Sequence, residues 1–293
     1  MRLRYAPSVT VAPLIFDRTL YRRRRARAAG SLSAHDFLHR RAMEDVVDRL
    51  ETVTREFPLA LFYGAGDLTS LLTPACGVGT VVAADLAAER IPGGRRAIAF
   101  DEERCPFAGA SFDLIVSLLT LHAANDPVGA LAQMRGALKP DGLLIAVAFG
   151  EETLGDLRRA LYEAEAGATG GVAARIAPFA SVRDWGGALQ RAGFALPVAD
   201  LDRVSVRYAG PGRLFADLRG MGETSCLAAR APALTRAAAV RLHERLGPQP
   251  EATFDLVTLT GWAPHDSQPR PLKPGSAARS LADAIRGADP APG

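Results

Sequence analysis

Apolar and polar positions follow two different patterns along the 293 residues. Near the start, the stretch SAHDFLHRRAMEDVVDRLETV places apolar residues at helical spacing, including Phe37, Met43 and Val46, and predicts an amphipathic helix. From Leu59 the pattern changes to short apolar runs that alternate with amphipathic segments. Alternation of this kind favours a parallel sheet that is covered by helices on both faces. The runs that predict strands span 59–63, 80–85, 96–100, 112–119, 142–149, 202–209 and 252–262.

The same pattern divides the chain into three parts. Residues 1–54 are expected to form an N-terminal helical cap. Residues 55–266 are expected to form one α/β domain, with a helical substrate region at 151–193. Residues 267–293 are rich in Pro, Gly and charge, which is typical of a flexible tail.

Charge and cysteine content narrow the classes of partner and compartment. The formal net charge is only +3, but five arginines lie between Arg22 and Arg27. Such a run forms either a solvated helix face or a patch for an acidic partner, and we expect a peripheral membrane contact here rather than nucleic acid. Three cysteines without CxxC spacing favour a reduced compartment and indicate no zinc site. A bacterial cytoplasm fits best, and the mitochondrial matrix would fit a eukaryotic chain.

The stretch LALFYGAGDLTSLL begins like the strand, turn and helix of a nucleoside-binding unit. Gly64 and Gly66 would supply the turn, and a helix is expected near Asp67 with its N–H groups facing a ligand. Asp85 ends the second run roughly 20 residues later, at the spacing of a carboxylate that accepts the hydroxyls of a ribose. Asp101 follows the third run, where a carboxylate can accept the amino group of an adenine. The alternative for both is an ordinary acidic residue at the end of a strand.

Over residues 55–150, the order of the segments LFYGAG, VVAADLA, FDEERCPFAGASFDLIVSLLTLHAAND and ALKPDGLLIAVAF resembles class I S-adenosylmethionine-dependent methyltransferases. The resemblance implies an α/β, Rossmann-like sheet of seven mostly parallel strands whose last strand is antiparallel. It also implies S-adenosylmethionine as the cofactor. The cofactor-binding residues that carry over are Gly64, Ala65, Gly66, Asp85, Leu86, Asp101, Glu102 and Leu118.

Further segments are similar to a narrower subgroup, over about 14–277. These segments are LIFDRTLYRRRRARAA, FGEETLGDLRRAL, APFASVRDWGGALQRAGF, YAGPGRLFADLRGMGET and GWAPHDSQPRPLKPGSA. The subgroup contains the respiratory complex I assembly factors of mitochondria and alphaproteobacteria, which are described as protein-arginine hydroxylases acting on an iron–sulfur subunit. The malonyl-carrier-protein methyltransferase of biotin synthesis is a more distant relative. The resemblance implies an enzyme with a protein substrate.

Two positions depart from the methyltransferase pattern. Phe62 stands where the family has an acidic residue, and Leu68 stands where it has a third glycine. Asp67 is the available substitute carboxylate or helix cap. Three alternatives therefore stay open: an enzyme that uses the cofactor to modify a protein, a catalytically inactive assembly chaperone, and a methyltransferase of a small acid or acyl carrier protein.

Catalytic chemistry is sparsely encoded. His122 follows the fourth run, where a general base would reach an acceptor, although a histidine in that place also serves as a packing residue. His265 and Asp266 are adjacent, which is not the spacing of an iron-binding triad, so no metal site is predicted. Trp185 and Trp262 are interpreted as packing residues, with a substrate lid as the alternative.

Overall fold

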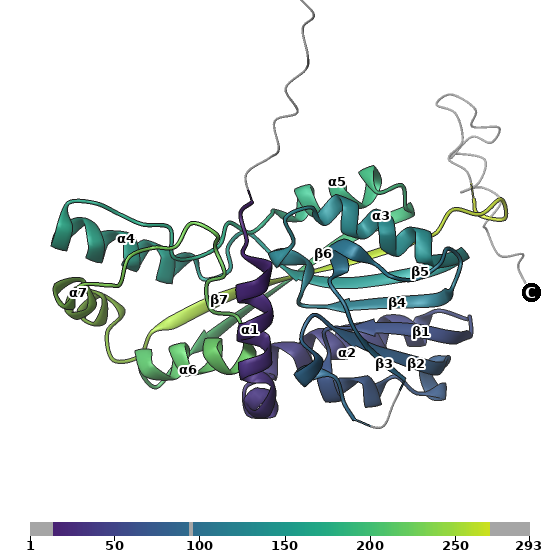
Figure 1. The fold of residues 1–293 in the computed structure, drawn as a ribbon, viewed down its shortest axis with the longest axis horizontal. Coiled ribbons are helices and arrows are strands. Elements are labelled where there is room, and N and C mark those ends of the chain that lie inside the picture. The colour runs from purple at the N-terminus through teal and green to yellow at the C-terminus, as the bar shows by residue number, and fades with distance from the viewer. Residues whose placement is uncertain (1–13, 94–95, 270–293) are drawn as a thin grey trace, which may run out of the picture.

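The computed structural model describes residues 14–93 and 96–269. Seven strands form one sheet in the order β3-β2-β1-β4-β5-β7-β6, in which β7 runs antiparallel to both of its neighbours (Figure 1). The predicted α/β fold, with seven strands and an antiparallel last strand, is confirmed. The strands are β1 (Phe57–Tyr63), β2 (Val78–Asp85), β3 (Ala97–Ala99), β4 (Phe112–Leu118), β5 (Leu138–Phe149), β6 (Ala195–Arg207) and β7 (Glu251–Trp262).

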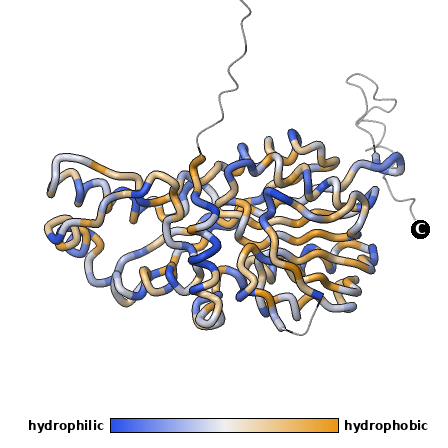
Figure 2. Tube along the Cα trace, viewed as in Figure 1, coloured by the Kyte–Doolittle hydropathy of each residue, from blue (hydrophilic) through white to orange (hydrophobic). Residues whose placement is uncertain are grey.

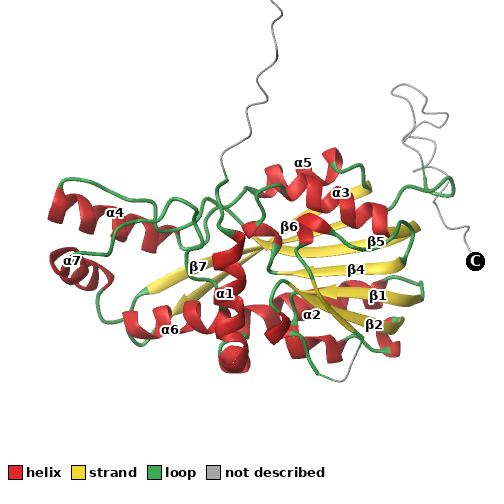
Figure 3. Ribbon diagram, in the orientation of Figure 1, coloured by secondary structure: helices red, strands yellow, loops and turns green. Residues whose placement is uncertain are grey.

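Helices cover both faces of this sheet, and a further group lies beyond one end of it (Figure 3). The α-helices are α1 (Arg18–Ala28), α2 (Phe37–Thr52), α3 (Pro127–Ala137), α4 (Gly155–Thr169), α5 (Val182–Arg191), α6 (Pro211–Met221) and α7 (Arg236–Leu246). Within 14–93 and 96–269, no helix is long and apolar enough to cross a membrane. The first 13 residues of the predicted cap and most of the predicted tail lie outside the described residues.

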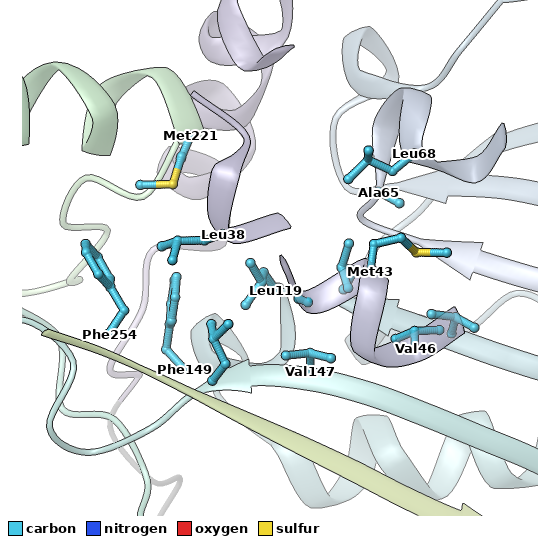
Figure 4. Close-up of a cluster of buried hydrophobic side chains, with 14 of the residues drawn as sticks. Leu38, Met43, Val46, Ala65, Leu68, Leu119, Val147, Phe149, Met221 and Phe254 are labelled. Atoms are coloured by element: carbon cyan, nitrogen blue, oxygen red, sulfur yellow. The ribbon is translucent and has the colours of Figure 1, made fainter. Parts of the chain in front are cut away.

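Helix α2 covers one face of the sheet. Leu38, Met43 and Val46 of its apolar stripe are fully buried, and Phe37 is partly buried. Figure 4 shows this stripe packed against Val147 and Phe149 of β5, within one cluster of buried side chains. Although α2 falls in the predicted cap, it therefore serves as a layer of the α/β domain.

Helices α3 and α5 cover the opposite face. Leu131 of α3 and Leu189 of α5 share a second buried cluster with Leu144 of β5. Trp185 of α5 is also buried there, and its Nε1 donates a hydrogen bond to the carbonyl oxygen of Phe149 at 3.2 Å. These contacts fit the packing interpretation of Trp185.

The connection between β1 and β2 differs from the prediction. Instead of an α-helix beginning near Asp67, it contains two 3-10 helices, η2 (Gly66–Leu71) and η3 (Pro74–Cys76). Gly66, the first residue of η2, has a φ of +54°, outside the range of a regular α-helix, and Pro74 lacks the N–H that a continuing helix needs. Asp67 is exposed and lies inside η2, whose N-cap position is Ala65, so Asp67 does not cap this helix. Helix α2 packs against both 3-10 helices and covers this part of the sheet instead.

Helices α4, α6 and α7 gather around the end of β7 that lies farthest from β2 and β3 (Figure 1). The antiparallel pair of β6 and β7, whose connection contains α6 and α7, is long enough to reach them, and α4 packs against α7 and β7. Helix α1 lies between this group and the edge of the sheet at which β1, β2 and β4 end (Figure 1). That edge carries the predicted binding residues.

Candidate functional site

Asp85, the predicted ribose-binding residue, ends β2 and points to an internal partner. Its side chain is 1% exposed, and both of its oxygens accept hydrogen bonds from Arg25 of α1. Nε of Arg25 lies 3.0 Å from Oδ1, and Nη2 lies 2.6 Å from Oδ2. Oδ1 also accepts the backbone N–H of Ala87 at 2.8 Å. This is the two-pronged geometry in which arginine binds carboxylates most strongly.

The rest of the Arg25 guanidinium is also enclosed by acceptors. Nη1 donates to the Tyr21 hydroxyl at 3.1 Å and to the carbonyl oxygen of Leu119 at 3.4 Å. Burial alone would lower the pKa of Arg25, but Asp85 raises it well above its usual value. Burial likewise opposes ionisation of Asp85, yet Arg25 lowers the pKa of this carboxyl below its usual value. Both groups are therefore charged in the folded chain.

Helix α1 presents Arg25 inward because of its own periodicity. Tyr21, Arg25 and Ala28 are its buried residues, and their spacing places them on one face. The Asp17 carboxylate caps the helix by accepting the N–H of Leu20 at 2.8 Å. The segment before α1 is tied to residues 226–228, since the N–H of Asp17 donates to the carbonyl oxygen of Cys226 at 2.8 Å. The helix is thus anchored at its start as well as along its buried face.

The arginine run is consequently divided between two environments. Arg25 is fully buried, whereas Arg22, Arg23 and Arg27 are exposed. Figure 2 shows α1 as a predominantly hydrophilic segment beside the apolar strands. Only the exposed part of the run can form the solvated face that the sequence predicts.

Asp101 and Glu102, the predicted adenine-side residues, meet a second arginine of α1. Nη2 of Arg18 lies 2.7 Å from Oδ1 of Asp101 and 3.3 Å from Oε2 of Glu102. Nε of Arg18 also donates to Oδ2 of Asp101 at 3.3 Å. The structure therefore brings both predicted acidic positions to the same helix.

The glycine loop is shaped by the protein itself. Gly64 has a φ of +91°, and a Cβ on it would lie 2.4 Å from the carbonyl oxygen of Leu118 in β4. Glycine is required here by the neighbouring strand. The carbonyl oxygen of Gly64 accepts Nη2 of Arg25 at 3.3 Å. Ala65, next in the loop, is buried.

The two residues that depart from the family pattern are both core residues. Phe62 and Leu68 belong to the buried cluster that α2 covers. Phe62 is fully buried and cannot replace the missing carboxylate. Leu68 lies in the 3-10 helix η2. No α-helix begins there whose N-terminus could approach a ligand closely.

The arrangement does not fit S-adenosylmethionine. Its ribose would need the Asp85 oxygens that Arg25 holds, and Gly64, Gly66 and Asp85 line none of the five main cavities of the described chain. One of these cavities does reach Leu86 and Asp101. Binding of the cofactor would require α1 to move away from Asp85.

A cavity of about 440 Å³ lies among α4, α6 and α7. Its walls are mainly apolar, and they include Leu157, Leu161, Phe179, Phe215, Leu218 and Leu242. Arg175 lines it too, but its charge is offset by Glu165, whose Oε1 lies 2.6 Å from Nη2. Arg219, another lining residue, is exposed. The cavity lining also includes His122 and Glu223, whose side chains are 2% and 9% exposed, as well as Thr224, Ser225, Cys226 and His243.

His122 lies in the 3-10 helix η6 (Leu121–Ala123), directly after β4, and its side chain is 2% exposed. Its Nε2 lies 3.0 Å from Oε2 of Glu223. The ring centroid is 4.6 Å from that of Phe149, so the imidazole is also packed from the side of β5. Within the described chain, Nδ1 is buried and has no hydrogen-bond partner.

Glu223 follows α6, lines the cavity and also contacts Tyr21 and Arg25 of α1. Its Oε1 accepts the Tyr21 hydroxyl at 3.3 Å and lies 3.6 Å from Nη1 of Arg25. Burial alone would raise the pKa of Glu223, but His122 and then Arg25 lower it below its usual value. This carboxylate is therefore ionised beside the imidazole, a pairing that orients a general base in many enzymes.

Asp85, Asp101 and His122 lie at or just after the ends of β2, β3 and β4, whereas the sequence pattern by itself does not identify Arg25 and Glu223, which contact this region. A signal for Arg25 was present, since it shares helical spacing with Tyr21. Glu223 offered no local signal, because its partner Tyr21 is 202 residues away. Within the described residues, no three His, Cys, Asp or Glu side chains are grouped so as to hold a metal ion.

The chain resembles known proteins at two levels. Residues 61–146 match the methyltransferase domain model. The YcgJ protein of Bacillus subtilis shares the fold with a TM-score of 0.53 and 14% identity, over 77% of this chain and 99% of that chain.

Two groups of relatives are similar in sequence. The malonyl-[acyl-carrier protein] O-methyltransferase of a Methylovorus species is 30% identical over 73% of this chain and 76% of its own length. The mitochondrial arginine-hydroxylase NDUFAF5 of Danio rerio is 38% identical over 92% of this chain and 89% of its own length. The chain belongs to the family of the arginine-hydroxylase NDUFAF5, within the methyltransferase fold.

Proposed function

We propose that this chain is an assembly factor that hydroxylates an arginine side chain of a protein, with an iron–sulfur subunit of respiratory complex I as the substrate. The observation that carries the proposal is the similarity to arginine hydroxylases over 92% of the chain. The His122 and Glu223 pair supports it, because it puts a base and a carboxylate beside a cavity among α4, α6 and α7.

The reaction balances with dioxygen as the oxidant and an external two-electron donor. One oxygen atom enters a C–H bond of the arginine side chain, and the other leaves as water with two protons. No step is assigned to S-adenosylmethionine, since Arg25 holds the Asp85 oxygens that the cofactor would need.

The proposal places the reaction where complex I is assembled, which is the cytoplasm of a bacterium or the mitochondrial matrix of a eukaryote. The exposed Arg22, Arg23 and Arg27 would contact the anionic membrane surface there.

The test compares complex I subunits from cells with and without the gene by peptide mass spectrometry. We expect one arginine to carry the additional mass of an oxygen atom only when the chain is present. Complementation with His122→Ala should not restore the modification, whereas the exposed-histidine control His265→Ala should restore it. If no subunit arginine differs between the strains, the proposed hydroxylation is refuted.

A second candidate function is an assembly chaperone that holds an immature subunit without modifying it. The buried pair of Arg25 and Asp85 favours it, because it closes the place where a methyltransferase binds its cofactor. In this case the deletion strain would lose assembled complex I although no subunit changes in mass. Complementation with His122→Ala would then restore assembly, which distinguishes this function from hydroxylation.

A further inference from the structure

We propose that a pocket between α1 and residues 225–231 binds a phosphate group, and that Arg24 is the principal residue that holds it. The pocket has a volume of about 260 Å³ and adjoins the cavity among α4, α6 and α7, with which it shares Arg175 and Ser225. The inference does not depend on the proposed hydroxylation. It gives the anionic contact proposed for α1 a defined site.

Arginines from three separate segments line this pocket. Arg24 belongs to α1, Arg175 follows α4 and Arg230 follows α6. The remaining lining residues are Leu20, Ser225, Leu227, Ala229 and Ala231. None of these described residues carries a carboxylate, so the lining itself is cationic.

Two of the three arginines already have counter-ions. Nη2 of Arg175 lies 2.6 Å from Oε1 of Glu165 and also donates to the carbonyl oxygen of Pro232 at 2.9 Å. Nη2 of Arg230 lies 3.4 Å from Oδ2 of Asp17, but the Arg230 side chain is 70% exposed. An exposed ion pair contributes little, so Arg230 is available to a stronger acceptor.

Arg24 differs from the other two arginines. Among the described residues, its side chain makes no hydrogen bond or ion pair, and it is only partly exposed. Burial lowers the pKa of Arg24 below its usual value, and repulsion by Arg230 and Arg27 acts in the same direction. Cys226 and Asp17 oppose this shift, but the Cys226 thiol, whose pKa burial raises to about 12, is uncharged at neutral pH. A bound anion would supply the missing counter-charge.

The arrangement of donors favours phosphate over a carboxylate. Arg24, Arg230 and the hydroxyl of Ser225 come from different segments, so donors surround the pocket from more than one side. A carboxylate offers two oxygens in one plane, whereas a phosphate offers acceptor oxygens in several directions. A phosphate group also carries a charge of about −1.5 to −2 at neutral pH. This charge matches the two guanidiniums that are unpaired or weakly paired.

Neighbouring arginines of α1 would attract an anion to the pocket. Leu20, Arg24 and Arg27 recur at helical spacing, and Arg23 lies next to them on the same side of α1. Arg23 and Arg27 are exposed. Clustered charges of one sign raise the local concentration of the opposite ion, so these two residues would assist binding without lining the pocket.

Two kinds of molecule present a phosphate group of this kind. The N–H of Ala228 donates to the carbonyl oxygen of Ile15 at 2.8 Å, so the segment before α1 lies beside the pocket. Leu14 and Ile15 in that segment are 66% and 46% exposed, and apolar side chains beside basic ones are typical of a surface that meets lipid. A free phosphate fits the pocket as well as a lipid headgroup does. The test therefore includes both.

Isothermal titration calorimetry of the full-length protein with inorganic phosphate measures the site directly. Sodium chloride at matched ionic strength is the control for general screening of the arginines. We expect saturable binding in the millimolar range or tighter, together with a rise in melting temperature that chloride does not produce.

Arg24→Met removes the charge while keeping a side chain of similar length. We expect it to weaken phosphate binding by about tenfold or more. Because Arg24 has no described partner, its replacement strands no other group, and the melting temperature without phosphate should not fall. Arg230→Met should also weaken binding. The matched control is Arg23→Met, on the same helix but outside the lining, which should bind phosphate like wild type.

Sedimentation with phosphatidylcholine vesicles, with and without phosphatidic acid, identifies the source of the phosphate. Loss of vesicle binding that is greater for Arg24→Met than for Arg23→Met assigns the pocket to a lipid headgroup. Equal losses in the two variants, with phosphate binding still dependent on Arg24, assign it to a free phosphate.

Two results would overturn the assignment: no saturable binding by the wild type at millimolar phosphate, or an unchanged affinity in Arg24→Met. Since no step of the hydroxylation uses Arg24, a modified subunit arginine found with either result would leave the proposed function standing and remove this site. Phosphate binding as expected with no modified arginine would retain the site and remove the hydroxylase.

Discussion

Replacement of Arg25 by methionine removes one charge from a buried pair while keeping a side chain of similar length. Asp85 would then remain 1% exposed and without its two strongest hydrogen bonds, those at 3.0 and 2.6 Å. Removing one partner of a buried ion pair typically costs about 3–5 kcal/mol, because the other charge is left uncompensated. Arg90 compensates in part, since its Nε lies 3.7 Å from Oδ2 of Asp85. We therefore expect the lower end of that range, about 3 kcal/mol.

Arg90 can replace only part of the interaction that Arg25 makes with Asp85. Burial, and then repulsion by Arg25, lower its pKa to about 10, so it is charged at neutral pH. Its Nη1 is already committed to the carbonyl oxygen of Met221 at 2.8 Å. It can attract Asp85 but cannot replace the two-pronged contact.

Urea unfolding at pH 7, followed by circular dichroism, measures the effect. A loss of about 3 kcal/mol corresponds to a fall of roughly 6–12 °C in melting temperature. The matched control is Arg23→Met, an exposed position on the same helix, which should unfold like wild type. Adding Asp85→Asn to Arg25→Met removes the stranded charge and should recover more than about 1 kcal/mol. A cost below about 1 kcal/mol for Arg25→Met, or a double variant less stable than the single one, would refute the reasoning.

Three further predictions concern the cofactor, pH and the glycine loop. Millimolar S-adenosylhomocysteine should leave the melting temperature of the wild type unchanged, because Arg25 holds Asp85. A ligand at about 100 times its dissociation constant would stabilise the fold by about 2.7 kcal/mol. A saturable rise in melting temperature would therefore contradict this prediction. His39 is buried, and burial followed by repulsion from Arg90 and Arg25 lowers its pKa well below 6.5. The unfolded chain therefore takes up a proton that the folded chain does not, and the free energy of unfolding should fall by about 1.4 kcal/mol per pH unit below about 6.5. Urea unfolding at pH 7.0 and 5.5 should show a smaller fall for His39→Gln, and an identical fall would disprove the assignment. Gly64→Ala should cost at least about 2 kcal/mol, because a Cβ there would lie 2.4 Å from the carbonyl oxygen of Leu118, whereas Gly93→Ala, with open space around it, should be neutral in the same assay.

The central strands could be predicted because β1, β4 and β5 are buried on both faces over most of their length. β5 reads as one apolar run, and all of its residues from Leu143 to Phe149 are buried. The start of β6 was missed, since the strand begins at Ala195 rather than near 202. This edge strand exposes Leu196 and Val198, and it contains Pro197, so its first half lacks the apolar alternation of a covered strand.

The candidate site was less predictable because its chemistry depends on distant partners. Asp85 could be placed at the end of a strand by spacing alone. Its role in this fold depends on Arg25, which is 60 residues earlier and lies within a run that is typical of exposed helices. The α-helix expected after β1 is replaced by two 3-10 helices, and α2 packs against them from the same side. Local patterns identify where acidic groups lie, and tertiary contacts decide what they bind.

The anchoring of α1 also sets an order of events during protein synthesis. Helix α1 leaves the ribosome before any strand, but Glu223 follows Tyr21 by 202 residues. At about 5–20 residues per second, the helix waits roughly 10–40 s for its last partner. The partners that hold Arg25 and Arg18, at residues 85, 101 and 102, are made well before then. Helix α1 can therefore dock on the sheet first, and the arrival of Glu223 completes an arrangement whose other partners are already in place.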